Sequence, residues 1–240
     1  MLAVFFIIFT LSGGEIVVAQ EFNFNLDDDQ AFSARVIQIL ALVTVLSLAP
    51  GIAIMITCFP FMVTVLAILR QGIGLQQSPP NMLIVSLALF LTYFVMEPVF
   101  LEAWKNGLSP LVEEQIAIEV AVERALEPFR TFMLARVDTD TFSVMANLRT
   151  DVTSETASAE APLSILVPSF MLSEIARAFQ VGFLLFLPFL VIDLVVAAVL
   201  MSMGMMMVPP AIVSLPFKLA FFVVADGWTL VADGLVRGYF

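Results

Sequence analysis

The chain has 240 residues, of which 61% are hydrophobic and only 13% are charged, and its net charge is −11. A soluble domain is about 45–50% apolar and about 25% charged, so this composition excludes an ordinary soluble globular protein and indicates an integral membrane protein. The chain contains no histidine and a single cysteine, Cys58, which excludes an internal disulfide and removes the commonest general base and transition-metal ligand.

The first residues predict a leader. An apolar run at residues 2–11 is followed by a glycine pair and by the small-residue pattern Val17-Val18-Ala19. This order is typical of a secretory signal peptide, residues 1–19, cleaved after Ala19. No Lys or Arg precedes the run, and the competing interpretation is a short fifth helix retained in the mature protein. Residues 20–35 include three consecutive aspartates and are expected to form an acidic, solvated tether.

Four apolar runs come near or exceed the length that crosses a membrane as a helix, which is about 20 residues for a hydrocarbon core of about 30 Å. They are residues 36–56, 82–96, 179–203 and 212–236. Residues 36–100 are expected to form a first hydrophobic helical hairpin that turns at residues 70–81. Pro50 and Pro60 predict a kinked or interrupted helix in its first half. The second run is expected to end before Pro98, because proline disfavours a helical conformation of the preceding residue.

The composition changes at residues 101–161, which hold eleven Asp or Glu against five Lys or Arg. This segment is predicted to be a small extramembrane helical region. One helix is expected to start at Ser109-Pro110, since proline is tolerated in a first turn. A second, amphipathic helix is expected around residues 128–145, followed by a flexible loop at 151–161.

Charge also gives an orientation for the first hairpin. Arg70 is the sole charge in the turn at residues 70–81, whereas the acidic tether and the acidic region lie at the opposite end of the hairpin. The positive-inside rule therefore places the turn in the cytoplasm and the acidic region outside. A cleaved leader predicts the same orientation.

Residues 162–240 are predicted to form a second hydrophobic hairpin, whose bend carries Met205, Met206 and Met207 and ends at a proline pair. Methionine fills irregular gaps in ordinary cores, which is the plainer interpretation of an apolar methionine cluster. Three consecutive methionines at a bend between two apolar runs instead favour a soft seal displayed on a loop.

Charged residues lie in or beside the last two apolar runs, among them Glu174, Arg177, Asp193, Lys218 and Asp226. An uncompensated charge at the centre of a membrane helix costs at least about 2.5–3.5 kcal/mol, so these groups need partners or water. Glu174 and Arg177 can pair at i, i+3. If the chain turns at the methionines, Asp193 and Lys218 differ in depth by about 4–5 Å and can pair across the hairpin. Such a pair either fixes the register of the hairpin or of subunits, or serves as a proton or ion relay.

Motifs along essentially the whole mature chain resemble one known family. They lie at residues 79–81, 89–92, 128–133, 174, 178–183, 188–194, 204–210, 215–219 and 226–228. Together they resemble the FliP family of the bacterial flagellar export gate and its virulence-secretion homologue SctR. Two positions depart from the family pattern: Phe61 stands where an arginine is usual, and Ala176 where a lysine is usual. The leader and Pro209-Pro210 resemble the flagellar branch more closely.

The resemblance implies an all-α subunit built of helical hairpins, with residues 101–161 as a small periplasmic helical region. It implies about five copies of this chain assembled with FliQ and FliR in the inner membrane at the flagellar basal body, with FlhB and FlhA nearby. The implied substrates are unfolded proteins, with neither a cofactor nor nucleic acid. Much of the complex would lie above the membrane plane, and Met205, Met206 and Met207 would form a ring that closes the pore.

The leading hypothesis is therefore a core channel-forming subunit of the flagellar type III export gate. The alternatives are a virulence secretion gate subunit and a small-solute or ion transporter that uses Asp193, Lys218 and Asp226. No inverted repeat is visible, which weakens the transporter hypothesis. An enzyme ranks third, because Asp193 and Asp226 have unlike flanks and no nucleophile–base set or metal-ligand set is present.

Overall fold

The computed structural model describes residues 29–75, 80–149, 161–205 and 207–239, and every regular element in these ranges is helical. The predicted all-α class is therefore confirmed. The predicted signal peptide at residues 1–19, tether residues 20–28, nearly all of the loop at 151–161, and Met206 lie outside the described residues. The chain divides into two compact units, residues 1–48 and 49–240, and each is described by itself.

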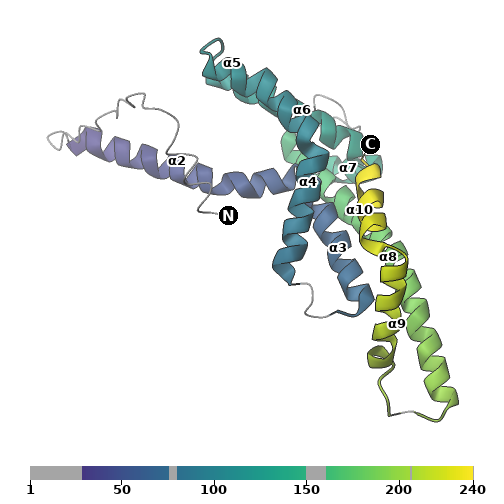
Figure 1. Cartoon of the computed structure of the whole chain (residues 1–240). Helices are drawn as coiled ribbons and strands as arrows, with labels where there is room; N and C mark the ends of the chain where they lie inside the picture. Colours follow the sequence, from purple (N-terminus) through teal and green to yellow (C-terminus); the bar gives the residue numbers. More distant parts are fainter. Residues whose placement is uncertain (1–28, 76–79, 150–160, 206, 240) are drawn as a thin grey trace, which may run out of the picture. The chain divides into compact units, whose positions relative to one another are not determined.

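The described part of the first unit belongs to helix α2 (Asp29–Met55), which continues into the second unit (Figure 1). Apolar side chains such as Ile37, Leu40 and Val43 are exposed on it. The hydroxyl groups of Thr44 and Ser47 donate to carbonyls of the preceding turn. A helix with exposed apolar side chains and internally satisfied hydroxyls suits lipid or a neighbouring subunit better than water.

In the second unit, the predicted interruption of the first hydrophobic block is confirmed. Helix α2 ends at Met55, residues 56–58 break the helix, and α3 (Phe59–Ile73) follows with Pro60 in its first turn. Proline is tolerated there because the N–H groups of a first turn have no partner within the helix. Gly74 ends α3 in the left-handed conformation, with φ of 88°, which glycine adopts without steric cost.

Helix α4 (Asn81–Ala103) runs through Pro98 and continues as a π-helical turn, η1 (Trp104–Leu108), and a short helix, α5 (Ser109–Val112). The prediction that this helix ends before Pro98 is therefore wrong. A helix does begin at Ser109 as predicted, but it is only four residues long and follows η1 directly. A proline inside a helix removes one backbone donor, and neighbouring helices can hold the helix together across the gap. Here α3 and α6 both pack against α4.

The acidic region contains α6 (Ile118–Arg136) and α7 (Thr139–Asn147). Pro128 lies inside α6, so the predicted boundary at residue 128 is wrong, and the break falls at residues 137–138 instead. Asp138 caps α7, because its carboxylate accepts hydrogen bonds from the backbone N–H and the hydroxyl of Thr141 at 2.9 and 2.8 Å. These bonds hold the pKa of Asp138 below its usual value and satisfy a free donor of the first turn.

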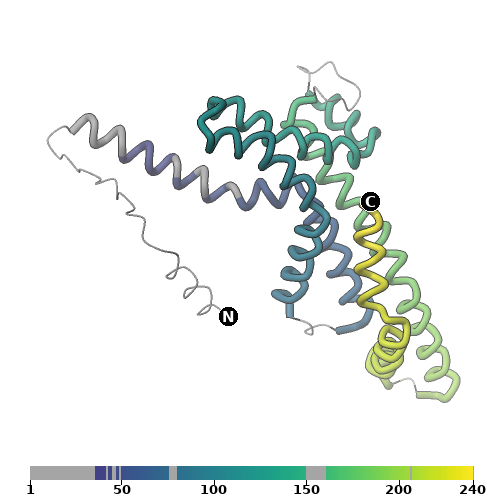
Figure 2. The backbone as a smooth tube through the Cα atoms, turned by 45° about the horizontal axis from the view of Figure 1, so that its top comes forward, coloured from purple at the N-terminus to yellow at the C-terminus, as the bar shows by residue number. Residues whose placement is uncertain are grey.

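The second hydrophobic hairpin is formed by α8 (Leu163–Ser202), α9 (Pro210–Val224) and α10 (Gly227–Arg237). Helices α8 and α9 lie side by side in both views (Figure 1, Figure 2). Helix α10 turns by 63° from α9 at Asp226, whose φ is 49°. The described residues thus include two helices long and apolar enough to cross a membrane, Asn81–Val112 and Leu163–Ser202, or three if the bent α9–α10 pair is one span. Three of the four runs expected to span a membrane, residues 82–96, 179–203 and 212–236, fall on these helices, and the fourth lies almost entirely within α2.

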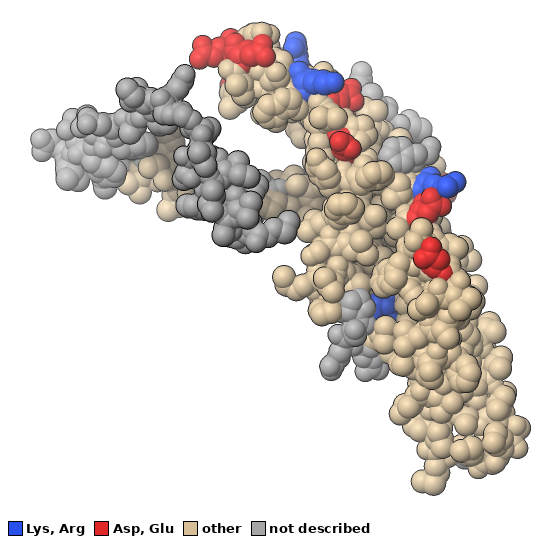
Figure 3. All heavy atoms as spheres, viewed as in Figure 1, with Lys and Arg blue, Asp and Glu red and all other residues tan. Residues whose placement is uncertain are grey.

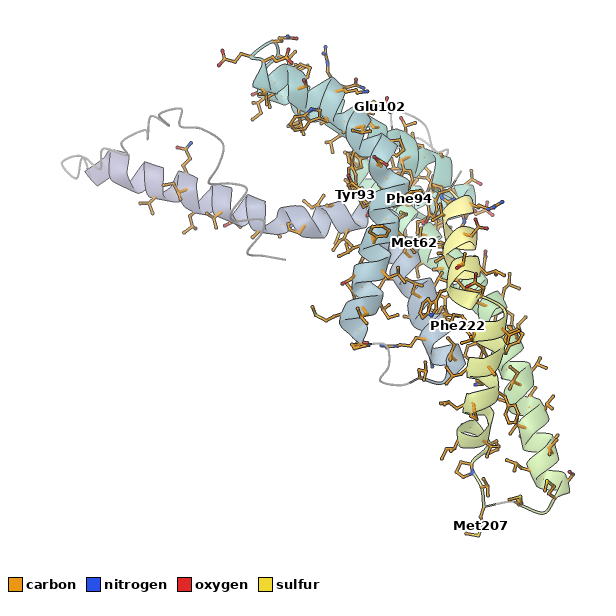
Figure 4. The ribbon with its side chains drawn as sticks, viewed as in Figure 1. Met62, Tyr93, Phe94, Glu102, Met207 and Phe222 are labelled. Carbon is orange, nitrogen blue, oxygen red and sulfur yellow. The ribbon has the colours of Figure 1, made fainter. Side chains whose placement is uncertain are left out.

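Two hydrophobic clusters hold the second unit together. The larger joins α3, α4, α8, α9 and α10 and includes Met62 and Phe222, both labelled in Figure 4. The smaller joins the end of α6 to α7 and the start of α8 through Met133, Phe142 and Phe170. Helix α8 belongs to both clusters, so it connects the acidic region to the second hairpin.

The close approach of η1 to α6 depends on Gly107. A Cβ atom at this position would lie 2.7 Å from the carbonyl oxygen of Ala121 and 2.8 Å from the amide nitrogen of Ala125. We expect Gly107→Ala to lower the free energy of unfolding by about 1–3 kcal/mol through overpacking. Thermal unfolding of the detergent-purified protein measures this loss. Gly234→Ala is the matched control, because no atom beyond the backbone of its own helix and its chain neighbours lies within 4 Å of its Cβ position. An equal loss in both variants would show that the approach at Gly107 is unimportant.

Candidate functional site

The bend between α8 and α9 displays the methionines. Gly204 has a φ of 74°, and the amide of Met205 donates to the carbonyl of Leu200 at 2.9 Å, so the chain leaves α8 through a compact turn. Met205 is 43% exposed and Met207 is 97% exposed, and Figure 4 shows Met207 at the tip of the hairpin. Met206 lies outside the described residues. Flexible thioether side chains are thus presented at the tip and not packed into a core.

The part of the hairpin that lies between Asp193 and Lys218 is uncharged along its whole length. No charged residue occurs in the sequence between Asp193 and Lys218, and Figure 3 shows no charged side chain on the displayed face of this end. A groove of about 680 Å³ lies between its two helices and is lined almost entirely by aliphatic, aromatic and methionine side chains, including Val195, Met203 and Phe217. The apolar part of the hairpin therefore begins where the ion pair ends.

Asp193 and Lys218 are brought together at the base of this apolar part. The Nζ atom of Lys218 lies 2.6 Å from Oδ2 of Asp193 and donates a second hydrogen bond of 3.0 Å to the carbonyl of Gly72 in α3. The hydroxyl of Ser214 donates to Oδ1 of Asp193 at 2.6 Å. We call Lys218, Asp193, Ser214 and the Gly72 carbonyl the Lys218 cluster. It fixes α9 to α8 and to α3, and it gives the 5% exposed Lys218 the partners that a buried charge requires.

A second group of charges surrounds Glu174 in the first third of α8. Nε of Arg136, at the end of α6, donates to Oε1 of Glu174 at 3.2 Å, and the hydroxyl of Tyr239 donates to Oε2. The predicted partner Arg177 is farther away, at 3.8 Å, and its side chain is 39% exposed. We call Glu174, Arg136, Arg177 and Tyr239 the Glu174 cluster. Arg136 and Tyr239 satisfy both oxygens of a fully buried carboxylate, whereas Arg177 adds only a surface contact.

Asp226 lies in neither cluster. It is exposed at the bend between α9 and α10, where its carboxylate accepts a hydrogen bond from the hydroxyl of Thr229 at 3.2 Å. Within the described residues, no three acidic or cysteine side chains lie together as metal ligands would. Cys58 is fully buried in the larger hydrophobic cluster. The arrangement as a whole offers an apolar hairpin held at its base by fully paired charges.

Sequence reasoning did not identify Arg136 or Tyr239. They lie 38 and 65 residues from Glu174 in the chain, so no helical spacing connects them to it. The sequence did indicate that Glu174 needs further partners, because a carboxylate in an apolar helix requires hydrogen bonds to both oxygens. One surface arginine at i+3 does not provide them.

Comparisons with known proteins give a consistent result. The family model described as "FliP family" matches residues 42–235. The chain is 54% identical to "Flagellar biosynthetic protein FliP" of Caulobacter vibrioides over 90% of this chain and 81% of that protein. It is 48% identical to the protein of the same name from Agrobacterium fabrum over 92% of both chains. It is 43% identical to that of Bacillus subtilis over 90% of this chain and 97% of that protein.

Proposed function

Because this chain belongs to the FliP family of flagellar export-apparatus components, we propose that it is a core channel-forming subunit of the export gate. Unfolded flagellar proteins would cross the inner membrane through this gate during assembly of the flagellum. The observation that carries the proposal is the uncharged hairpin end between Asp193 and Lys218, with its exposed methionine tip.

An exposed apolar tip is unfavourable in water, and patches of this kind mark contact sites. Arranged around a common axis, the tips of several copies would place Met205, Met206 and Met207 in one ring. An apolar constriction of this kind resists ions by excluding water. Unbranched methionine side chains can repack around the varied side chains of a passing polypeptide. The hairpin tip would therefore act as a compliant seal.

The exposed apolar surface of helix α8 is evidence for assembly with further copies and other subunits. Only 11% of the residues in its most apolar stretch are buried within the chain, so lipid or neighbouring subunits must cover the rest. We propose that about five copies of this chain assemble with FliQ and FliR, with FlhB and FlhA close by. Membrane spans recognised by length alone would then become subunit contacts.

We also propose that the acidic region at residues 101–161 is periplasmic. Its composition is strongly acidic, whereas the turn at the other end of the first hairpin has Arg70 as its sole charge. Arg70 donates a hydrogen bond to Asn81, across the turn between α3 and α4. A positively charged turn is favoured on the cytoplasmic side.

The alternative of a small-ion or solute transporter depends on Asp193 and Lys218 acting as a relay. The geometry favours a role in fixing register, because Lys218 and Asp193 bind each other and each has a second partner in the same cluster. Fixing register is the best-attested use of a buried ion pair. The relatives compared are named for the flagellum, which favours the flagellar over the virulence branch.

Purification of the chain from its native host tests the assembly. The subunits that come with it are identified by mass, and the lone chain is reconstituted into sealed vesicles for a parallel uptake assay. We expect a multi-copy complex that contains two other export-gate subunits, and no solute uptake by the lone chain. Uptake without a complex would support the transporter and reject the proposed gate.

A further inference from the structure

We propose that Arg136 and Tyr239 form a latch that ties the joint between α6 and α7, and the segment after α10, to the first third of α8. The latch consists of Arg136, Glu174, Tyr239 and the carbonyl of Gly238. Its role is positional: it fixes the N-terminal part of α8, the helix that leads to the methionine tip. The inference depends on the contacts within one chain, so it stands whether or not the methionines form a seal.

Arg136 makes three contacts at once. Its Nε donates to Glu174 at 3.2 Å, and a terminal nitrogen donates to the carbonyl of Gly238 at 2.7 Å. Its guanidinium carbon lies 3.9 Å from the centre of the Tyr239 ring. A planar guanidinium group can serve two acceptors while stacking on an aromatic face, whereas a lysine ammonium cannot keep this geometry. The three contacts therefore depend on arginine and not on positive charge alone.

Tyr239 connects the latch to the hydrophobic core. Its hydroxyl donates to Glu174, its ring stacks on Phe132 of α6 at 6.1 Å, and it meets the edge of Phe61 in α3 at 5.6 Å. One side chain thus contacts α3, α6 and α8. Aromatic pairs at these distances add attraction beyond the burial of apolar area.

The same joint is tied to α8 a second time. The backbone N–H of Asp138 donates to the hydroxyl of Ser173 at 3.0 Å, and Ser173 precedes Glu174 in α8. The bonds from residues 136 and 138 therefore reach two successive residues of one helix. Arg136 and Tyr239 share the carboxylate of Glu174, and the Asp138 bond lies two residues along the chain from Arg136, so loss of one bond weakens the others. The latch is expected to open as a unit.

Cys58 reports on the latch. It lies in the break between α2 and α3 and is fully buried. Its thiol is close enough to Glu174 and Arg136 to interact electrostatically with both. Phe61, which contacts Tyr239, lies in the next turn of the chain and in the same hydrophobic cluster. Cys58 is also the only cysteine, so a thiol reagent modifies one site. Opening of the latch should expose this thiol.

The test measures the rate at which N-ethylmaleimide alkylates Cys58 in membranes from the native host, with the chain in its assembled complex. Arg136→Lys and Tyr239→Phe are each expected to raise the rate about tenfold, as the loss of a hydrogen bond to a charged group predicts. The double variant should exceed the single variants only slightly. The matched controls, Arg237→Lys and Tyr93→Phe, change exposed side chains and should leave the rate unchanged.

Rates equal to the parent in both latch variants, or equally raised rates in the controls, would overturn the proposal. If the latch variants do not accumulate, hydrogen exchange of the unmodified complex decides the matter. The amides of Val137 and Tyr239, which both donate to backbone carbonyls, should show similar protection, because one opening exposes both. Rapid exchange at Tyr239 with a protected Val137 would show that no latch joins them.

Discussion

Lys218→Met is expected to loosen the base of the α8–α9 hairpin. The substitution leaves Asp193 with only the Ser214 hydroxyl and removes the donor to the Gly72 carbonyl. Removing one partner of a fully buried ion pair costs about 3–5 kcal/mol. Because the Asp193 side chain is 32% exposed and keeps the Ser214 hydroxyl as a partner, we expect a smaller loss, about 2–3 kcal/mol. Amide hydrogen exchange of the purified complex measures it.

The loss of stability should appear as lower amide protection in two segments. Exchange should quicken in α9 and at the end of α3, since Lys218 binds both Asp193 and the Gly72 carbonyl, and it should stay unchanged in α7. A double variant, Lys218→Met with Asp193→Leu, should recover most of the protection, because a well-packed apolar pair can replace a buried ion pair. Unchanged exchange in the single variant would show that the pair does not hold the hairpin. Worse exchange in the double variant would show that both charges are needed.

Much of the helical architecture follows from the sequence, but proline was a poor guide to helix ends. Pro60 and Pro210 lie in the first turns of α3 and α9, where a missing N–H costs little. Pro98 and Pro128 lie inside helices that continue past them. Helices α4 and α6 continue past these prolines because they pack against each other and against other helices. This tertiary packing outweighs the local tendency of proline to end a helix, which is all that the sequence alone can assess.

The two charge clusters also differ in how far the sequence predicts them. Asp193 and Lys218 lie on two helices joined by a short bend, so the rise per residue is enough to place them at similar depths. Arg136 and Tyr239 reach Glu174 from α6 and from the segment after α10. Their meeting depends on how several helices pack, and no spacing in the sequence encodes it. Phe61 is part of that packing through its contact with Tyr239.

Replacing Met205, Met206 and Met207 with alanine is expected to leave assembly intact but to open a leak for small ions. Each substitution removes the sulfur and two carbons from the tip of the hairpin, and a constriction stays dry only while its lining is large and apolar. Assembly should survive because the Lys218 and Glu174 clusters and both hydrophobic clusters lie elsewhere. A barrier lowered by about 1.4 kcal/mol raises the leak about tenfold.

The matched control is the triple leucine variant. Leucine keeps an apolar side chain of similar size, so the barrier to ions should be largely preserved. Its branched side chain adapts less readily than methionine to a passing polypeptide, so export should slow. The alanine and leucine variants therefore separate the two tasks assigned to the methionines, because the first impairs the barrier and the second impairs passage.

The most direct measurement of the proposed seal is the ion conductance of membranes that contain the assembled gate, with the amount of complex matched between the parent and the triple alanine variant. The proposed channel role predicts a conductance about tenfold higher for the alanine variant and close to the parent value for the leucine variant. An alanine variant that assembles fully and remains as impermeable as the parent would show that the methionines are ordinary packing and do not close a pore.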